Sequence, residues 1–227
     1  IIIRNNKLIL YCPHKSIEYN SFKNKYTNTQ ECWMEDFIDG TMINVFFDNI
    51  NNVWEIATKS TVGGNIFFFN DIQNLSIFND SNNSNNSNNS NNITFRTMFF
   101  ESCNACNFDL NCLDKKYTYT FVMQHPFNRI VTPVQTPTLY LIKIYDIDNT
   151  NFPNVTIIEK NIAEFINVPP YIFTNTNIKF VNKYPISNTL DELYNFYNTD
   201  LLPYDCVGFF IYNNDGTRTK IRNKNYE

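Results

Sequence analysis

The sequence lacks three features that would place it in a broad protein class at once. It has no run of about 18 apolar residues, so no membrane-spanning helix and no membrane partner are expected. It shows no signal-peptide pattern. Lys and Arg number only 18 against 22 Asp and Glu, which gives a net charge of −4. Binding to nucleic acid would therefore need a local basic patch rather than a uniformly basic surface.

The chain also lacks an initiator methionine. It begins with three isoleucines, a pattern that is typical of a strand. We therefore expect a fragment of a longer protein. Its 227 residues, 43% of them hydrophobic, suffice for one domain with a packed core, and we expect residues 1–227 to form a single domain. Ser-Asn-Asn repeats bury too little apolar area to offset the entropy of ordering, so we predict a disordered loop at 79–93 within that domain.

Histidine is scarce, and the six cysteines do not indicate a disulfide framework. Without a secretory signal, reduced thiols and an intracellular location are expected. Cys103, Cys106 and Cys112 have a spacing at which thiolates can bind zinc, but a fourth ligand would have to come from a distant part of the chain. Free thiols are the favoured interpretation, and the zinc site stays open. His125 has no second histidine nearby except His14 and predicts no metal site.

Extended patterns outnumber helical ones along the chain. Strands are predicted at 7–12, 41–47, 53–58, 117–122, 138–145, 206–212 and 218–222. Helices are predicted after the capping residue Thr94 and at 158–166 and 189–197. Because no alternation of strand, helix and parallel strand appears, the predicted fold class is α+β, with mainly antiparallel sheets and a few helices.

The hairpin at 41–58 brings a lysine towards an Asp-Gly pair. If Asp48 faces Val53, then Lys59 lies at the same end of the hairpin as Asp39 and Gly40. The separation along the strand would be on the order of 10 Å.

Four sequence elements occur in a characteristic order. Residues 11–15 read Tyr-Cys-Pro-His-Lys, and residues 37–41 read Phe-Ile-Asp-Gly-Thr, followed by Thr-Lys-Ser at 58–60. Residues 126–131 read Pro-Phe-Asn-Arg-Ile-Val, and the segment 207–222 holds Val-Gly-Phe-Phe-Ile, Asp-Gly and Lys-Ile-Arg. Together they resemble the bacteriophage-type ATP-dependent RNA ligases, which are covalent nucleotidyltransferases. That family has Phe-Pro-Lys, Lys-x-Asp-Gly-Ser, Lys-Ser-Lys-Gly, Phe-Glu before Pro-x-Asn-Arg-Ile-Val, and Glu-Gly followed by Lys-φ-Lys. The resemblance covers nearly the whole chain, and the variant motifs also resemble proteins of large DNA viruses.

The resemblance implies a nucleotidyltransferase fold with ATP held between two sheets. In such enzymes a lysine attacks the α-phosphate, pyrophosphate leaves with Mg²⁺, and AMP passes to an RNA 5′ phosphate. The nucleotide-binding residues that it implies are Lys15, Asp39, Gly40, Lys59, Lys220 and Arg222. Asn128 and Arg129 are implied either to bind RNA or to form a structural turn.

Three positions depart from the family pattern. Phe37 stands where the family has its lysine, and Val122 and Val207 stand where it has glutamates. None of these side chains can attack phosphorus or bind a metal, and loss of a nucleophile costs on the order of 10⁶ in rate. No lysine lies within five residues of Asp39. We expect binding of ATP or RNA ends with doubtful adenylylation. A substitute nucleophile such as Lys59, and a non-catalytic RNA- or protein-interaction module that keeps only the scaffold, both remain open.

Overall fold

The computed structural model describes residues 1–227 except 67–92, 129, 168, 170, 200, 201, 204 and 227. Residues 79–92 of the predicted loop at 79–93 belong to the first of these gaps, and Arg129 is a gap of its own. Both lie outside the described residues, so the structure does not test them.

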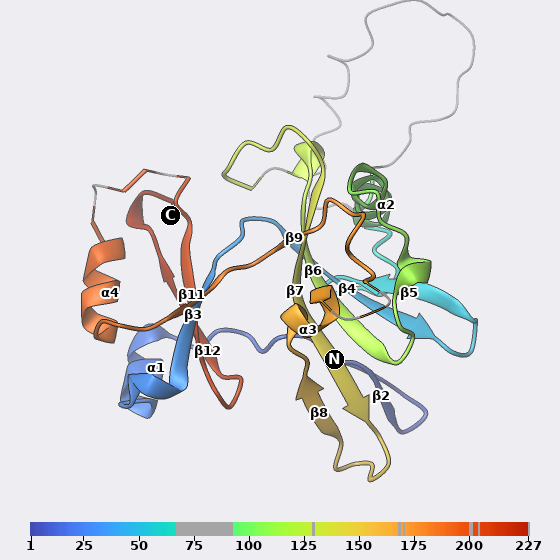
Figure 1. Ribbon diagram of the computed structural model, residues 1–227, viewed down its shortest axis with the longest axis horizontal. Coiled ribbons are helices and arrows are strands. Elements are labelled where there is room, and N and C mark those ends of the chain that lie inside the picture. The colour runs from blue at the N-terminus through green and yellow to red at the C-terminus, as the bar shows by residue number, and fades with distance from the viewer. Residues whose placement is uncertain are drawn as a thin grey trace, which may run out of the picture.

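A four-stranded antiparallel sheet forms one half of the molecule (Figure 1). Its order is β10 (Lys183–Pro185), β3 (Cys32–Asp36), β11 (Gly208–Asn213) and β12 (Arg218–Arg222). Two helices, α1 (Tyr19–Lys25) and α4 (Leu190–Tyr197), cover its outer face. Phe22 of α1 and Leu190 of α4 pack on Ile211 and Ile221 of the sheet, and all four side chains are buried. The opposite face of this sheet is therefore turned towards the rest of the molecule.

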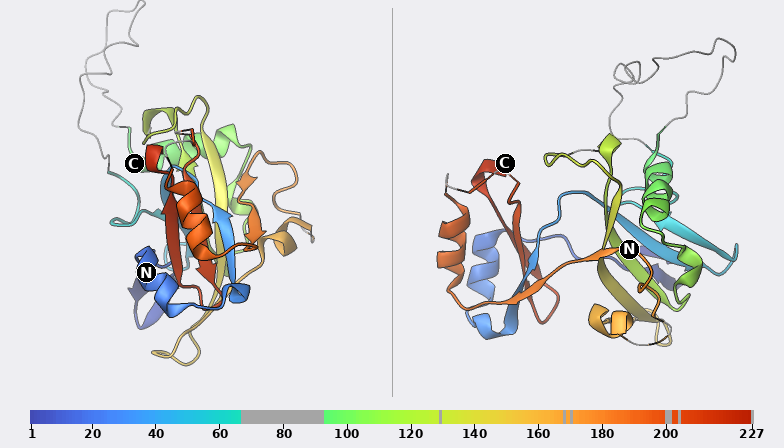
Figure 2. Two further views of the ribbon diagram at one scale, coloured as in Figure 1. Left: turned by 90° about the vertical axis from the view of Figure 1, so that its left-hand side faces the viewer. Right: turned by 45° about the horizontal axis from the view of Figure 1, so that its top comes forward.

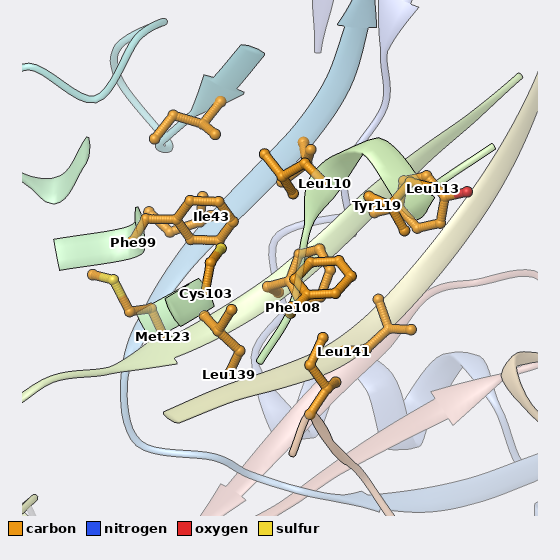
Figure 3. Close-up of a cluster of buried hydrophobic side chains, with 14 of the residues drawn as sticks. Ile43, Phe99, Cys103, Phe108, Leu110, Leu113, Tyr119, Met123, Leu139 and Leu141 are labelled. Carbon is orange, nitrogen blue, oxygen red and sulfur yellow. The ribbon is translucent and has the colours of Figure 1, made fainter. Parts of the chain in front are cut away.

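A six-stranded sheet forms the other half. Its path is β5 (Val53–Ala57), β4 (Thr41–Asp48), β6 (Tyr117–Gln124), β7 (Thr138–Asp148) and β8 (Thr156–Glu159), and β9 (Lys179–Phe180) pairs with β7. The outer face packs against α2 (Phe95–Ala105), and Figure 3 shows part of this main core. Ile43, Phe99 and Met123 are fully buried there. The two sheets lie between the outer helices, as the right-hand view of Figure 2 shows.

Several shorter elements complete the fold. They are β1 (Ile2–Arg4), β2 (Lys7–Leu10), α3 (Ile162–Asn167), and the 3-10 turns η1 (Thr29–Glu31), η3 (Leu110–Cys112), η4 (Pro126–Asn128) and η5 (Lys224–Tyr226). The β1–β2 hairpin packs against Phe46 and Ala57 on the inner side of the large sheet.

The predicted fold class is confirmed, because all strand ladders in the described residues are antiparallel except the short β7–β9 pair. The register of the β4–β5 hairpin is also confirmed, with Asp48 opposite Val53. The predicted helix at 158–166 is wrong in its first part. Thr156–Glu159 is strand β8, because it pairs along β7, and the helix starts only at Ile162. Helix α1 and strand β3 were not predicted.

Residues 37–40 carry the chain from β3 in the small sheet to β4 in the large one. Gly40 is required in this link, because a Cβ there would lie 2.6 Å from the Met123 carbonyl oxygen and 2.6 Å from Val122 Cγ1. The close approach fixes the link against β6. The Phe-Ile-Asp-Gly-Thr element therefore sits where the two sheets meet.

Candidate functional site

The inner face of the small sheet carries aromatic and charged side chains. Phe210 of β11 faces Glu35 on one side and Lys220 on the other, so the three side chains share a face. Tyr212 likewise faces Trp33 and Arg218. Side chains alternate along a strand, so the neighbouring residues Met34, Ile211 and Ile221 point to the opposite face, into the outer core. This polar and aromatic face is turned towards the large sheet.

Phe37 lies at one end of that face. Its backbone N–H donates to the Gly208 carbonyl at 3.2 Å, and its ring centroid is 4.5 Å from that of Phe210. The Arg222 guanidinium lies 5.4 Å from the centre of the Phe37 ring. Since Lys220 is opposite Phe210, the structure brings Lys220 and Arg222, two cations that the resemblance implies, close to Phe37.

Asp39 is buried beside this cluster and makes three side-chain hydrogen bonds within the protein. Its Oδ2 accepts from the backbone N–H groups of Val131 (3.1 Å) and Thr132 (2.9 Å), and its Oδ1 accepts from the Tyr226 hydroxyl at 2.8 Å. Burial, and then the hydrogen bond to Asp39, raises the pKa of Tyr226 to about 12. Asp39 thus joins the loop after β6 to the end of the described chain. Its role in nucleotide binding stays a prediction.

Asn128 holds the same loop to the start of β4. Its Nδ2 donates to Thr41 Oγ1 at 2.6 Å, and its side chain is buried. In addition, Gln124 Nε2 donates to the Asp39 carbonyl at 2.8 Å. The Pro-x-Asn and Asp-Gly-Thr elements therefore bind each other, which agrees with the structural alternative for Asn128.

Lys15 and Lys59 lie elsewhere. Lys15 is exposed and follows His14, whose carbonyl accepts from Arg218 Nε at 2.7 Å. Arg218 and Arg222 are the two ends of β12, about 13 Å apart along the strand. Lys59 is exposed in the turn after β5, because the ladder with β4 ends at Ala57. These positions do not bring Lys15 or Lys59 into the Phe37 cluster.

A buried ion cluster that the sequence did not predict ties the two sheets together. Lys143 of β7 is 1% exposed, and its Nζ lies 2.8 Å from both Glu35 Oε1 and Glu159 Oε1. Burial acts to lower the pKa of Lys143, but Tyr212 and the two carboxylates outweigh it, so the pKa is raised. Lys143 therefore stays protonated and is unsuited to act as a nucleophile. A lone lysine inside the apolar stretch 139–144 was the available signal.

The two valines at the glutamate positions are buried. Val122 and Val207 are each 8% exposed, and Val122 packs against the backbone at Gly40. His125 is buried too, with Nε2 hydrogen-bonded to Glu101 at 2.9 Å, and burial lowers its pKa although Glu101 acts to raise it. The two valine side chains offer no acid–base or metal-binding atoms, and the His125 ring is engaged by Glu101.

The cysteines are free thiols in the structure. Burial raises the pKa of Cys103 to about 12. Within the described ranges, no group of three or more His, Cys, Asp or Glu side chains could hold a metal ion. Among the helices that the structure describes, none is both long and apolar enough to cross a bilayer.

Comparison with known proteins gives a likeness of fold alone. No protein-family model matches the chain, and no curated protein matches it by sequence. Among solved structures, the RNA ligase of Naegleria gruberi in a mutant form with ATP and Mn superposes with a TM-score of 0.55 at 10% identity, over 99% of this chain and 58% of the ligase.

Two further mutant forms of the same ligase agree. The form with AMP and Mn gives a TM-score of 0.53 at 10% identity over 95% of this chain and 57% of that chain. The apo form gives 0.52 at 11% identity, over 100% of this chain and 62% of that chain. The chain thus spans less than two thirds of the length of these structures. It has an α+β fold of mainly antiparallel sheets like that of this RNA ligase.

Proposed function

We propose that the chain is an RNA ligase-like nucleotidyltransferase domain that binds ATP or an RNA end without forming the usual lysine–nucleotide adduct. The fold likeness to a ligase solved with ATP and with AMP supports the first part. The second part rests on Phe37, which occupies the place of the attacking lysine. The binding site that we propose is the end of the inner sheet face that carries Phe37, Lys220 and Arg222.

One observation carries the proposal: two cations remain next to an aromatic ring at the position of the missing nucleophile. Arg222 lies over Phe37, and Lys220 shares the face with Phe210. Arginine and lysine bind phosphate by charge-assisted hydrogen bonds, while aromatic rings stack on bases. This pairing suits a nucleotide or a 5′-phosphorylated end, but it offers no group that can attack phosphorus.

The donor set does not fit a protein-bound Mg²⁺ or Mn²⁺ at this place. Both oxygens of the Asp39 carboxylate accept hydrogen bonds from the protein, and the two glutamate positions hold buried valines. Divalent cations of this kind require oxygen ligands. We therefore derive no metal-dependent step from these residues.

The test is a binding titration with ATP, GTP and a short 5′-phosphorylated RNA. Replacing both cations, Lys220→Gln with Arg222→Gln, should weaken binding by about tenfold or more, because hydrogen bonds to charged groups contribute on that order. Lys23→Gln is the matched control, since Lys23 belongs to α1 on the outer side of the same sheet and pairs with Asp191. Equal affinities for the double variant and the control would contradict the proposed site.

A second candidate is a non-catalytic RNA- or protein-interaction module that keeps only the scaffold. The observation in its favour is that apolar side chains fill the positions of the missing groups. The Phe37 and Phe210 rings are in contact, and Val122 and Val207 are buried. As a protein-interaction module, this candidate predicts no affinity for ATP, GTP or the 5′-phosphorylated RNA at any salt concentration. As an RNA-interaction module, it predicts RNA binding that Lys220→Gln with Arg222→Gln leaves unchanged, so the same titration separates the candidates.

A further inference from the structure

A cavity of about 390 Å³ lies between the two sheets, away from the Phe37 cluster. Trp33 and Tyr212 of the small sheet line one side, and Tyr145 and Glu159 of the large sheet line the other. The volume is within the range of about 300–1,000 Å³ that is typical of small-molecule sites, which also favour the junctions between structural units.

The cavity is distinct from the proposed nucleotide site. Tyr212 is four residues along β11 from Gly208, which corresponds to about 13 Å. Glu35 lies two residues along β3 from Trp33, towards Phe37, and its ion pair with Lys143 is buried. Arg218 Nη1 also donates to the Tyr212 hydroxyl at 2.8 Å, which fixes the wall on that side.

The walls are aromatic and held in place by contacts within the protein. Trp33 and Tyr212 stack with an interplanar angle of 7° and centroids 5.5 Å apart. On the other side, Tyr11 meets Tyr145 edge to face at 4.9 Å. The Trp33 indole N–H donates to Glu35 Oε1 at 3.1 Å, which sets the ring orientation. Rings that are already oriented favour a planar aromatic ligand, because little side-chain entropy is lost on binding.

The charge around the cavity favours an anionic ligand. Its two carboxylates are engaged, since Glu159 pairs with Lys143, and Asp215 accepts from Tyr26 and from the Thr217 N–H. Two lysines also line the cavity, but the Lys160 ammonium lies 6.0 Å from the centre of the Tyr117 ring, which packs on the outer core, so Lys183 is the cation that a ligand would meet. Lys183 is half exposed, with its Nζ 5.2 Å from the centre of the Trp33 ring and 3.6 Å from the Glu35 carboxylate.

We propose that this cavity is a second binding site, which takes a nucleoside phosphate with its base against the aromatic wall and its phosphate at Lys183. The same chemistry is offered by a free mononucleotide and by one unpaired nucleotide of an RNA strand. The inference does not depend on binding at Lys220 and Arg222.

The experiment follows the indole N–H resonance of Trp33 by NMR during titration with AMP, with a short single-stranded RNA and with adenosine. The chain has only two tryptophans, so a Trp54→Phe variant assigns the signal. Saturable shifts with AMP and RNA identify a mononucleotide site, and shifts with RNA alone identify a strand nucleotide. The Lys183→Gln variant should weaken the binding by about tenfold or more.

Two controls keep this result separate from the proposed function. Lys220→Gln with Arg222→Gln should leave the Trp33 titration unchanged, and Lys23→Gln should do the same. The inference is overturned if neither AMP nor RNA shifts the Trp33 resonance at millimolar concentration. It is also overturned if adenosine binds as tightly as AMP, or if the Lys183→Gln variant binds like the wild type.

Discussion

The Lys143 cluster gives the sharpest stability prediction. Among the described residues, Lys143→Met would leave Glu35, itself 1% exposed, with the Trp33 N–H at 3.1 Å and the Lys183 ammonium at 3.6 Å. Removing one member of a buried pair costs about 3–5 kcal/mol, because the remaining charge is left without compensation. The Glu159 side chain is 32% exposed, so water can hydrate its carboxylate once Lys143 is gone, and the loss of this second ion pair should add little to the free-energy cost. For a chain of this size the expected fall in melting temperature is on the order of 10 °C.

The assay is urea denaturation of the wild type, Lys143→Met, Glu35→Gln and the double variant. We expect Lys143→Met to cost about 3–5 kcal/mol and Glu35→Gln to cost less, because Lys143 keeps Glu159 at 2.8 Å. The double variant should cost less than their sum by about 2 kcal/mol or more. Lys116→Met is the matched control, since Lys116 pairs with Asp146 but is 60% exposed, and it should cost less than about 1 kcal/mol. Single variants as mild as the control, or strictly additive costs, would refute a buried pair between the sheets.

Three further predictions concern single positions. Because burial lowers the pKa of His125, its neutral form stabilises the fold above its ordinary pKa of about 6.5, and this stabilisation is lost as the pH falls through the lowered pKa. The urea concentration at the unfolding midpoint should therefore be lower at pH 5 than at pH 7. For His125→Asn, which keeps an acceptor for the Phe127 N–H, this difference should be smaller. An equal difference in the variant and the wild type would contradict the role of His125. Gly208→Ala should cost at least about 2 kcal/mol, because Gly208 has φ +124° and a Cβ would lie 2.1 Å from the Ile221 oxygen; an unchanged thermal midpoint would exclude this backbone strain. Phe37→Lys should yield no covalently labelled protein with α-labelled ATP, because the two glutamates are still absent; a stable adduct would show that lysine alone suffices.

Local patterns predicted the elements that are stabilised locally. Thr94 forms a capping box with Thr97 at the start of α2, and the turn at Asp215-Gly216 closes the β11–β12 hairpin, as expected. Strand β3 was missed because its polar residue Glu35 breaks the apolar alternation that a sequence search requires. Glu35 is buried only because Lys143 from a distant strand neutralises it. Such pairing depends on tertiary structure and has no local signal.

In the candidate site, too, features that follow from local sequence could be predicted, whereas contacts that depend on tertiary structure could not. Side chains alternate along a strand, so the strand predicted at 218–222 has Lys220 and Arg222 on one face, and only strand pairing brings Arg222 to Phe37. The sequence could not show that the Asp39 carboxylate is engaged by the loop at 131–132, since that contact spans about ninety residues and depends on the packing of the link against β6. It also could not show that Lys15 lies near the opposite end of β12.

The most direct test of the central claim measures how much α-labelled ATP the protein retains, first in the native state and then after denaturation of the same sample, with Mn²⁺ or Mg²⁺ present. The account predicts that label is retained by the native protein on a filter, is reduced in the Lys220→Gln, Arg222→Gln variant, and is lost entirely on denaturation. Label that survives denaturation, on Lys59 or on any other residue, would contradict binding without adduct formation. Absence of label on the native protein at millimolar ATP, together with no affinity for 5′-phosphorylated RNA, would contradict binding itself.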